Sequence, residues 1–212
     1  SQAFEATNSG IQIGNHENAA EIVGRVVTAA EQLGVKYVIS PECGHAFTSI
    51  RWLGPNLIGR PYKFEVIHIL ELLEELKQQG RIAFKGKTDE PVTFHDPCQI
   101  VRRGGVVKPQ RDLLNSVAEN FVEMTDHGVM NWCCGGGGGV SANERADELR
   151  ARAFHRKRRQ IEETGADTVV TACANCRMML EEGIEENHMD TTIIGLTELV
   201  AEYLVTEKAG AA

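Results

Sequence analysis

The sequence predicts an α/β protein in which a layered parallel sheet is covered by helices on both faces. Stretches with apolar residues at helical spacing alternate with short apolar runs rich in β-branched residues, and glycines mark the ends of several helical stretches. The chain has 212 residues, of which 42% are hydrophobic, so it can bury a proper core. Such alternation joins parallel strands through right-handed crossovers, which gives a Rossmann-like architecture.

The first half of the chain supplies one helix–strand unit and a second helix. Residues 15–34 show helical periodicity and end at a glycine, and the run 36–40 follows at once as a short strand. After a turn-rich segment, residues 64–80 form a strongly amphipathic pattern that predicts one helix. The polar connector 85–91 then leads into the second half.

The second half alternates more regularly. The expected elements are a strand at 92–96, a helix from residue 110 running into a strand near Phe121, a long helix at 141–165, a strand at 167–172, a helix after the C-x-x-C, a strand at 191–195 and a helix at 196–205. The glycine run 135–139 is the one low-complexity segment of the sequence.

Charge and hydropathy argue against two classes of partner. A formal net charge of -8 and a pI near 5.4 disfavour nucleic acid, because phosphate binding needs clustered Lys and Arg. The basic run 150–160 is interpreted as a solvated helix face, with docking to an acidic partner as the alternative. No apolar run is long enough to span a bilayer, and residues 1–10 lack the features of a signal peptide. We therefore expect a cytoplasmic protein. Because the chain begins with Ser1, we also expect a fragment or a processed product.

Six cysteines fall into groups that indicate a metal site. The groups are two single cysteines, a vicinal pair and a C-x-x-C, namely Cys43, Cys98, Cys133–Cys134 and Cys173-x-x-Cys176. Disulfide frameworks belong mostly to small secreted proteins, so we interpret these thiols as reduced and available to metal.

The cysteines also follow predicted strands. The strands 36–40, 92–96 and 167–172 are each followed within a few residues by a cysteine, and the vicinal pair follows the strand near Phe121 through a loop. Ligand sites of open parallel sheets lie beyond the carboxyl ends of the strands. The sequence therefore predicts that these loops converge on one metal or cluster site.

The grouping favours an iron–sulfur cluster over zinc. Structural zinc is satisfied by four ligands in tetrahedral geometry, commonly two C-x-x-C pairs or mixtures of Cys and His. A vicinal pair projects its thiols in divergent directions, and a centre with several irons accommodates such a pair better than a single ion does.

The glycine run fits an anionic cluster. Gly135, Gly136 and Gly137 can bring backbone N–H groups close to sulfur and form an anion-binding nest. Ser141 and Glu144 match a capping box, which predicts a helix whose positive dipole end faces the site. Cys98 and the C-x-x-C are also expected at helix N-termini. Neither nucleotide-binding glycine motif fits the run.

The full spacing resembles the CCG domain of the catalytic subunits of heterodisulfide reductases and their relatives. The matching residues are Cys98, Cys133–Cys134–Gly135 and Cys173-x-x-Cys176. The motifs ECGHA, HDPCQ and ACANC are most similar to the heterodisulfide-reductase-like subunit of Dsr-type membrane complexes of sulfate reducers. The similarity runs from residue 15 to residue 204.

The resemblance implies a cofactor and a reaction. The five cysteines of the motif, Cys98, Cys133, Cys134, Cys173 and Cys176, would hold a noncubane [4Fe-4S]-type cluster that cleaves a disulfide reductively in one-electron steps. The substrate would be a heterodisulfide or a small protein carrying a disulfide or trisulfide. Electrons would come from a membrane quinol-oxidising partner and other iron–sulfur subunits, which would place the chain at the cytoplasmic face of the membrane.

The resemblance also implies a division of the chain. Residues 91–212 would form the CCG iron–sulfur domain, and residues 1–90 would be a degenerate upstream half-domain that retains Cys43 and His45. We expect catalytic roles for these two residues, since His45 can donate a proton to a departing thiolate. The alternative for His45 is a plain loop residue. Ferredoxin-like cysteine motifs of larger members are missing from this sequence, which again suggests a C-terminal fragment.

Two other functions stay open on the sequence alone. Related CCG domains occur in electron-transfer subunits of complexes that oxidise glycolate, lactate or glycerol 3-phosphate. A noncatalytic module stabilised by zinc is the second alternative, and five clustered thiols disfavour it.

Four single residues near the motif have competing interpretations. His95 is expected to be structural, and Trp132 to pack beside the cluster and exclude water. Arg102 and Arg103 either hold an anionic group or lie on the surface.

Overall fold

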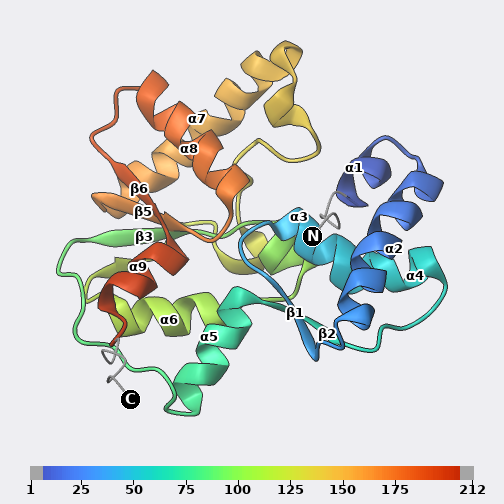
Figure 1. The fold of residues 1–212 in the computed structure, drawn as a ribbon. Helices are drawn as coiled ribbons and strands as arrows, with labels where there is room; N and C mark the ends of the chain where they lie inside the picture. Colours follow the sequence, from blue (N-terminus) through green and yellow to red (C-terminus); the bar gives the residue numbers. More distant parts are fainter. Residues whose placement is uncertain (1–6, 206–212) are drawn as a thin grey trace.

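The computed structural model describes residues 7–205 and confirms an α/β protein with parallel strands flanked by helices (Figure 1). The strands are β1 (Tyr37–Ser40), β2 (Glu65–His68), β3 (Val92–His95), β4 (Phe121–Val122), β5 (Thr168–Thr171) and β6 (Thr192–Gly195). The α-helices are α1 (Thr7–Gln12), α2 (His16–Gln32), α3 (Gly44–Thr48), α4 (Gly54–Ile58), α5 (Ile69–Gln78), α6 (Pro109–Val117), α7 (Asp147–Thr164), α8 (Ala174–Glu186) and α9 (Leu196–Tyr203).

Short helical segments complete the chain. Ser49–Leu53 and Gln99–Arg103 are π-helical, and Gly128–Met130, Val140–Ala142 and Glu144–Ala146 are 3₁₀ turns. Among the described residues, no helix combines the length and the apolar composition that crossing a bilayer requires.

Within the described residues the strands form two parallel sheets rather than one. The larger has the order β4-β3-β5-β6, and the smaller pairs β1 with β2. Every residue of β3 and of β5 is buried, because α7 and α8 lie over one face of the larger sheet and α6 and α9 over the other (Figure 1). Fully buried strands of this kind are typical of parallel sheets covered on both faces.

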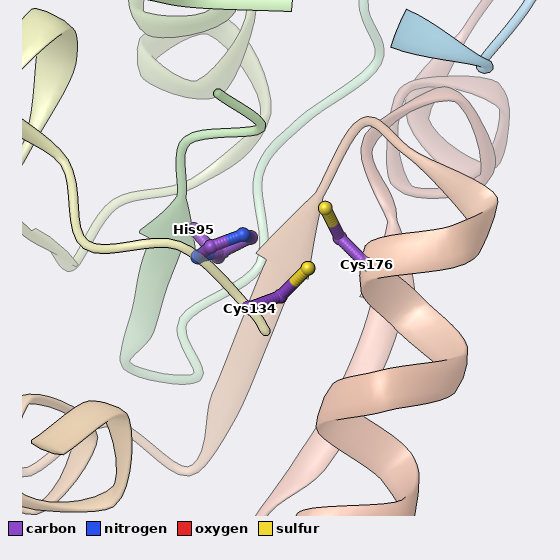
Figure 2. Close-up of side chains that lie close together, drawn as sticks. All are labelled: His95, Cys134 and Cys176. Carbon is purple, nitrogen blue, oxygen red and sulfur yellow. The ribbon is translucent and has the colours of Figure 1, made fainter. Parts of the chain in front are cut away.

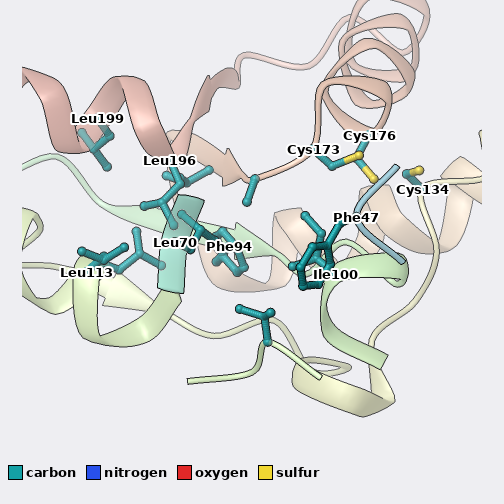
Figure 3. Close-up of a cluster of buried hydrophobic side chains, with 14 of the residues drawn as sticks. Phe47, Leu70, Phe94, Ile100, Leu113, Cys134, Cys173, Cys176, Leu196 and Leu199 are labelled. Carbon is teal, nitrogen blue, oxygen red and sulfur yellow. The ribbon is translucent and has the colours of Figure 1, made fainter. Parts of the chain in front are cut away.

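The hydrophobic core lies between the larger sheet and α6 and α9 and continues toward the cysteines. Phe94, Leu113 and Leu196 are each at most 1% exposed. In Figure 3 the thiols of Cys173 and Cys176 lie at one end of this core, near Phe47 and Ile100. The site is therefore anchored on rigid, fully packed structure.

The single helix predicted for 64–80 is wrong in its first turn. Glu65–His68 form β2, which pairs in register with Tyr37–Ser40 of β1, and α5 begins only at Ile69. His68 then caps α5, because its Nδ1 accepts the Leu70 N–H at 3.3 Å. The apolar residues Phe64, Val66 and Ile67 fit a helix or a strand, and pairing with β1 selects the strand.

The capping box predicted at Ser141 and Glu144 is also wrong. Both residues lie in 3₁₀ turns, and α7 starts at Asp147. Arg150 holds this segment in turns, since its guanidinium donates to the carbonyls of Val140 and Asn143 at 3.2 Å each. The long helix is accordingly shorter at its N-terminus than expected.

The two sheets meet through the segments that follow Cys43 and Cys98. A Cβ atom on Gly44, the first residue of α3, would lie 2.8 Å from Gln99 Cβ and 2.9 Å from Ile100 Cγ1. Only a glycine permits this approach. The domain boundary near residue 90 stays a prediction.

Candidate metal centre

The structure brings the five cysteines of the motif into one continuous series of contacts. Cys98 precedes the π-helical segment after β3, Cys133 and Cys134 lie on the loop after β4, and Cys173 and Cys176 lie at the start of α8. The thiols hydrogen-bond in the order Cys98, Cys133, Cys134, Cys176, Cys173. The last three in this order are buried, and Cys98 and Cys133 are partly exposed.

The contacts perturb the acidity of the thiols in opposite directions. Hydrogen bonds from Cys134 and Cys98 lower the pKa of Cys133, while the hydrogen bond to Cys133 raises the pKa of both donors. Hydrogen bonds with Cys134 and Cys173, together with burial, raise the pKa of Cys176 well above its usual value. Thiols that share protons in this way can exchange them for metal, since metal binding requires thiolates.

Backbone amides also favour thiolate at the site. The Gly135 N–H donates to Cys133 Sγ at 3.4 Å, and the Gly136 N–H donates to Cys134. The hydrogen bond from Cys176 lowers the pKa of Cys173 to about 6, and the Gly44 amide adds to this effect. The predicted glycine nest is therefore present in part, and it is extended by an amide from the first half of the chain.

Gly136 is a glycine because α8 passes close to it. A Cβ atom there would lie 2.3 Å from Met179 Cγ and 3.0 Å from Asn175 Nδ2. Gly137 has more room, and its nearest neighbour would be the His45 ring at 3.6 Å.

Arg102 fixes the loop that carries the vicinal cysteines. Its Nε donates to the Val129 carbonyl at 2.8 Å, and a terminal N–H donates to the Asn131 carbonyl at 2.6 Å. This side chain, one turn after Cys98, thus joins the Cys98 segment to the vicinal-cysteine loop. The sequence suggests that Arg102 either holds an anion or lies on the surface. In the structure its guanidinium instead hydrogen-bonds the backbone of the vicinal-cysteine loop.

Asp96 holds the same loop from inside the core. Its side chain is fully buried, accepts the Gly128 N–H at 2.6 Å and pairs with Arg111 through two bonds of 2.6 and 2.7 Å. Arg111 also binds Glu123. Because bidentate charge-assisted bonds fix geometry strongly, this network sets where the loop begins.

Trp132 docks the loop onto α7. Its indole N–H donates to the Ala153 carbonyl at 3.1 Å, and the Arg156 guanidinium lies 4.1 Å from the centre of its ring. The side chain is partly buried beside Cys133.

A lysine and a histidine lie behind the thiols. Lys157 on α7 is 1% exposed, and its ammonium contacts Met124 Sδ at 3.5 Å without a carboxylate ion pair among the described residues. Burial lowers the pKa of Lys157 to about 8, and the charges of Asp96 and Cys134 oppose that shift. His95, at the end of β3, places a ring nitrogen within 4.8 Å of Cys134 Sγ and Cys176 Sγ (Figure 2).

Cys43 and His45 line an open cavity of about 300 Å³ beside the glycine run. Gly136, Gly139 and Asn175 also line it. Cys43 is exposed and caps the N-terminus of α3, where its Sγ accepts the Ala46 N–H at 3.5 Å. Both predicted catalytic residues therefore share a cavity with the glycine run, although none of the five motif cysteines is among its lining residues.

Sequence reasoning missed three residues that shape the site. Asp96 and Arg111 act only through tertiary contacts, and no local pattern marks them. Lys157 belongs to the run interpreted as a solvated basic face, although it lies at helical spacing between buried Phe154 and Ile161. That spacing is the signal that could have revealed its burial.

Comparison with known proteins matches the part of the chain that carries these five cysteines. The family model for the cysteine-rich domain called CCG matches residues 92–181. Residues 92–181 form a CCG cysteine-rich domain.

Relatives of the chain include subunits of a heterodisulfide reductase and of a menaquinol oxidoreductase. A subunit of the dihydromethanophenazine:CoB–CoM heterodisulfide reductase of Methanosarcina barkeri is 33% identical over 88% of this chain and 45% of its own length. Hdr-like menaquinol oxidoreductase iron–sulfur subunit 2 of Archaeoglobus fulgidus is 27% identical over 92% of this chain and 42% of its own length. The chain thus spans less than half the length of either relative.

A solved structure of a glutamate racemase isoform from Bacillus anthracis is 15% identical, with a TM-score of 0.44 over 88% of this chain and 63% of that one.

The donor set of the CCG domain fits an iron–sulfur cluster. Five thiols in one series exceed the four that one tetrahedral ion uses, and amides and a buried ammonium offset negative charge around them. The prediction of an iron–sulfur cofactor agrees with the CCG match and with the subunits to which the chain is related.

Proposed function

We propose that this chain is the iron–sulfur, disulfide-reducing part of a membrane-linked respiratory complex in sulfur metabolism. The observation that carries the proposal is the continuous series of five thiols, with a cavity nearby that Cys43, His45 and Gly136 line. Cys98 and Cys133 of the series are partly exposed, which suits reaction with an external sulfur compound.

The five cysteines of the series would hold a noncubane [4Fe-4S]-type cluster, namely Cys98, Cys133, Cys134, Cys173 and Cys176. Such a cluster supplies single electrons to a bound sulfur–sulfur bond. The amides of Gly135 and Gly136 donate to thiolate sulfur there, and Gly137 leaves room beside the His45 ring.

Cys43 and His45 would act on the substrate from the cavity. Cleavage of a disulfide consumes two electrons and releases two thiolates, which need protons to leave as thiols. His45 would hold a proton for one of them, and Cys43 would contact the substrate sulfur. The substrate would be a heterodisulfide or a small protein with a cysteine-based disulfide or trisulfide.

The electrons would reach the site from partner subunits that oxidise a membrane quinol. The relative from Archaeoglobus fulgidus carries a menaquinol oxidoreductase name, which supports this source. In the proposed arrangement, residues 91–212 form the CCG iron–sulfur domain, and residues 1–90 form a half-domain that covers it with Cys43 and His45. Partner subunits would hold the chain at the cytoplasmic face of the membrane.

Anaerobic purification with assays for iron and labile sulfide tests the proposal directly. We expect both elements, and a paramagnetic signal that appears and disappears during a redox titration. Stoichiometric zinc without sulfide would overturn the proposal.

Cys134→Ala and Cys43→Ala separate ligation from substrate contact. Cys134→Ala should lose iron and the paramagnetic signal, because it removes the central thiol of the series. Cys43→Ala should keep both and lose reduction of a disulfide by the assembled complex. Equal iron loss in the two variants would contradict the division of roles.

A further inference from the structure

His95 is buried at the end of β3 with its ring directed at the cysteines. Its exposure is 1%, and the neighbouring core residue Phe94 lies toward Arg111 of α6, whose guanidinium is 5.6 Å from the Phe94 ring. Because successive side chains of a strand point to opposite faces, the His95 ring points to the other side, where α7 and α8 lie. Figure 2 shows the ring facing the thiols of Cys134 and Cys176.

Neither ring nitrogen of His95 has a hydrogen-bond partner among the described residues. Buried polar side chains are almost always satisfied, so an unpartnered imidazole in the core requires an explanation. The carbonyl of His95 is already engaged, since it accepts the Thr171 hydroxyl at 3.2 Å. The unpartnered atoms are therefore confined to the ring.

Sulfur is the acceptor that the surroundings offer. A ring nitrogen of His95 lies within 4.8 Å of both Cys134 Sγ and Cys176 Sγ. The charged neighbour from α7, Lys157, has only N–H donors and cannot accept a hydrogen bond. An imidazole carries at least one N–H in either charge state, so a donor is always available.

We propose that His95 is a positioning residue of the cluster site, whose ring N–H donates a hydrogen bond to the sulfur of the assembled centre at the Cys134–Cys176 side. The inference rests on the proposed function, because it needs the cluster to be present. Hydrogen bonds to sulfur stabilise the more negative, reduced state of such a centre. His95 therefore raises the midpoint potential of the cluster.

The decisive measurement needs no substitution. The full chain is produced with ¹⁵N-labelled histidine, reconstituted anaerobically with iron and sulfide, and studied by pulsed electron paramagnetic resonance. We expect a weak nitrogen coupling that changes with the isotope. No histidine coupling, or a strong coupling typical of direct ligation, would overturn the assignment of His95 as a donor.

Three variants assign the coupling to one residue. His95→Leu should lose the coupling and shift the midpoint potential to more negative values. His95→Gln keeps an N–H donor and should restore most of that potential. His68→Leu is the matched control, because His68 is also fully buried with an unpartnered ring nitrogen but lies on β2 of the smaller sheet. His68→Leu should leave the potential and the coupling unchanged, and an unchanged potential in His95→Leu would overturn the inference.

The controls distinguish this inference from the proposed function. Wild-type protein that binds no iron and sulfide overturns both proposals. Wild-type protein that assembles a cluster without a histidine coupling overturns only the role of His95.

Discussion

At the scale of single residues, the charge of Lys157 is the feature that most needs a cofactor. A buried ammonium is costly unless an anion pairs with it, and this one contacts the thioether of Met124. The thiolates of a bound cluster supply the missing negative charge. The negative charge of a bound cluster therefore accounts for the buried ammonium of Lys157.

Replacing Lys157 with Met should make the cluster harder to reduce. A nearby positive charge stabilises the reduced state, so its removal should lower the midpoint potential by an amount on the order of tens of millivolts. Redox titration followed by paramagnetic resonance measures this shift. Arg159→Met on the same helix removes an exposed charge, 70% accessible, and should leave the potential close to the wild-type value. Equal shifts in both variants would contradict the role of Lys157.

His68 should make stability depend on pH. Burial lowers the pKa of His68 from 6.5 to about 4. The unfolded chain takes up a proton as pH falls through 6.5, whereas the folded chain does not do so until about pH 4. Unfolding free energy should therefore fall across this window by up to roughly 3 kcal/mol from this residue.

His68→Asn tests that origin. The Asn side chain can still accept an amide as a helix cap, but it does not titrate. Denaturant unfolding at pH 7 and at pH 4 should show a smaller loss of stability in the variant. If the free energy of unfolding falls equally with pH in the wild type and in His68→Asn, the pH dependence comes from groups other than His68.

At the scale of elements, the packing of the glycine run on α8 decides the geometry of the vicinal pair. The amides of Gly135 and Gly136 reach sulfur because α8 carries Met179 and Asn175 directly against the run. The glycine run can pack this closely against α8 only because Gly136 has no Cβ atom.

Gly136→Ala should therefore damage the site, whereas Gly137→Ala should not. The added methyl group of Gly136→Ala must displace Met179, and overpacking of this kind costs roughly 1–3 kcal/mol. At Gly137 the nearest atom is at an ordinary contact distance of 3.6 Å. Iron retention and unfolding free energy, measured for both variants, check the contrast. Equal iron retention would show that the fit at Gly136 does not matter.

At the scale of the whole molecule, the first half of the chain takes part in the site. The Gly44 amide donates to the Cys173 thiolate, and α3 lies against the segment that follows Cys98. Residues from both halves line the cavity as well, among them Cys43 and His45 from the first half and Gly136 and Asn175 from the second.

Gly44→Ala should weaken the site from outside the CCG domain. Its methyl group would clash with Gln99 and Ile100, separate the two halves and lower iron retention, with a stability loss of roughly 1–3 kcal/mol. Gly24→Ala on α2 is the control, since no atom lies within 4 Å of its added methyl group. That control should stabilise the helix by up to about 1 kcal/mol. Full iron retention in Gly44→Ala would show that the halves are independent.

Local periodicity and cysteine spacing along the chain were enough to predict the α/β class, most of the elements and the resemblance to the CCG domain. The strand at 65–68 could not be predicted in this way, because its apolar pattern fits a helix or a strand and pairing with β1 selects the strand. The tertiary structure also decided that Ser141 and Glu144 lie in turns, through the contacts of Arg150.

The same limit applies to the candidate site. Its thiols are marked by their spacing, but Lys157, His95, Asp96 and Arg102 gain their positions from residues distant in the chain. Charge and hydrogen bonding act through space, so the surroundings of the thiols become visible only when the elements are packed together.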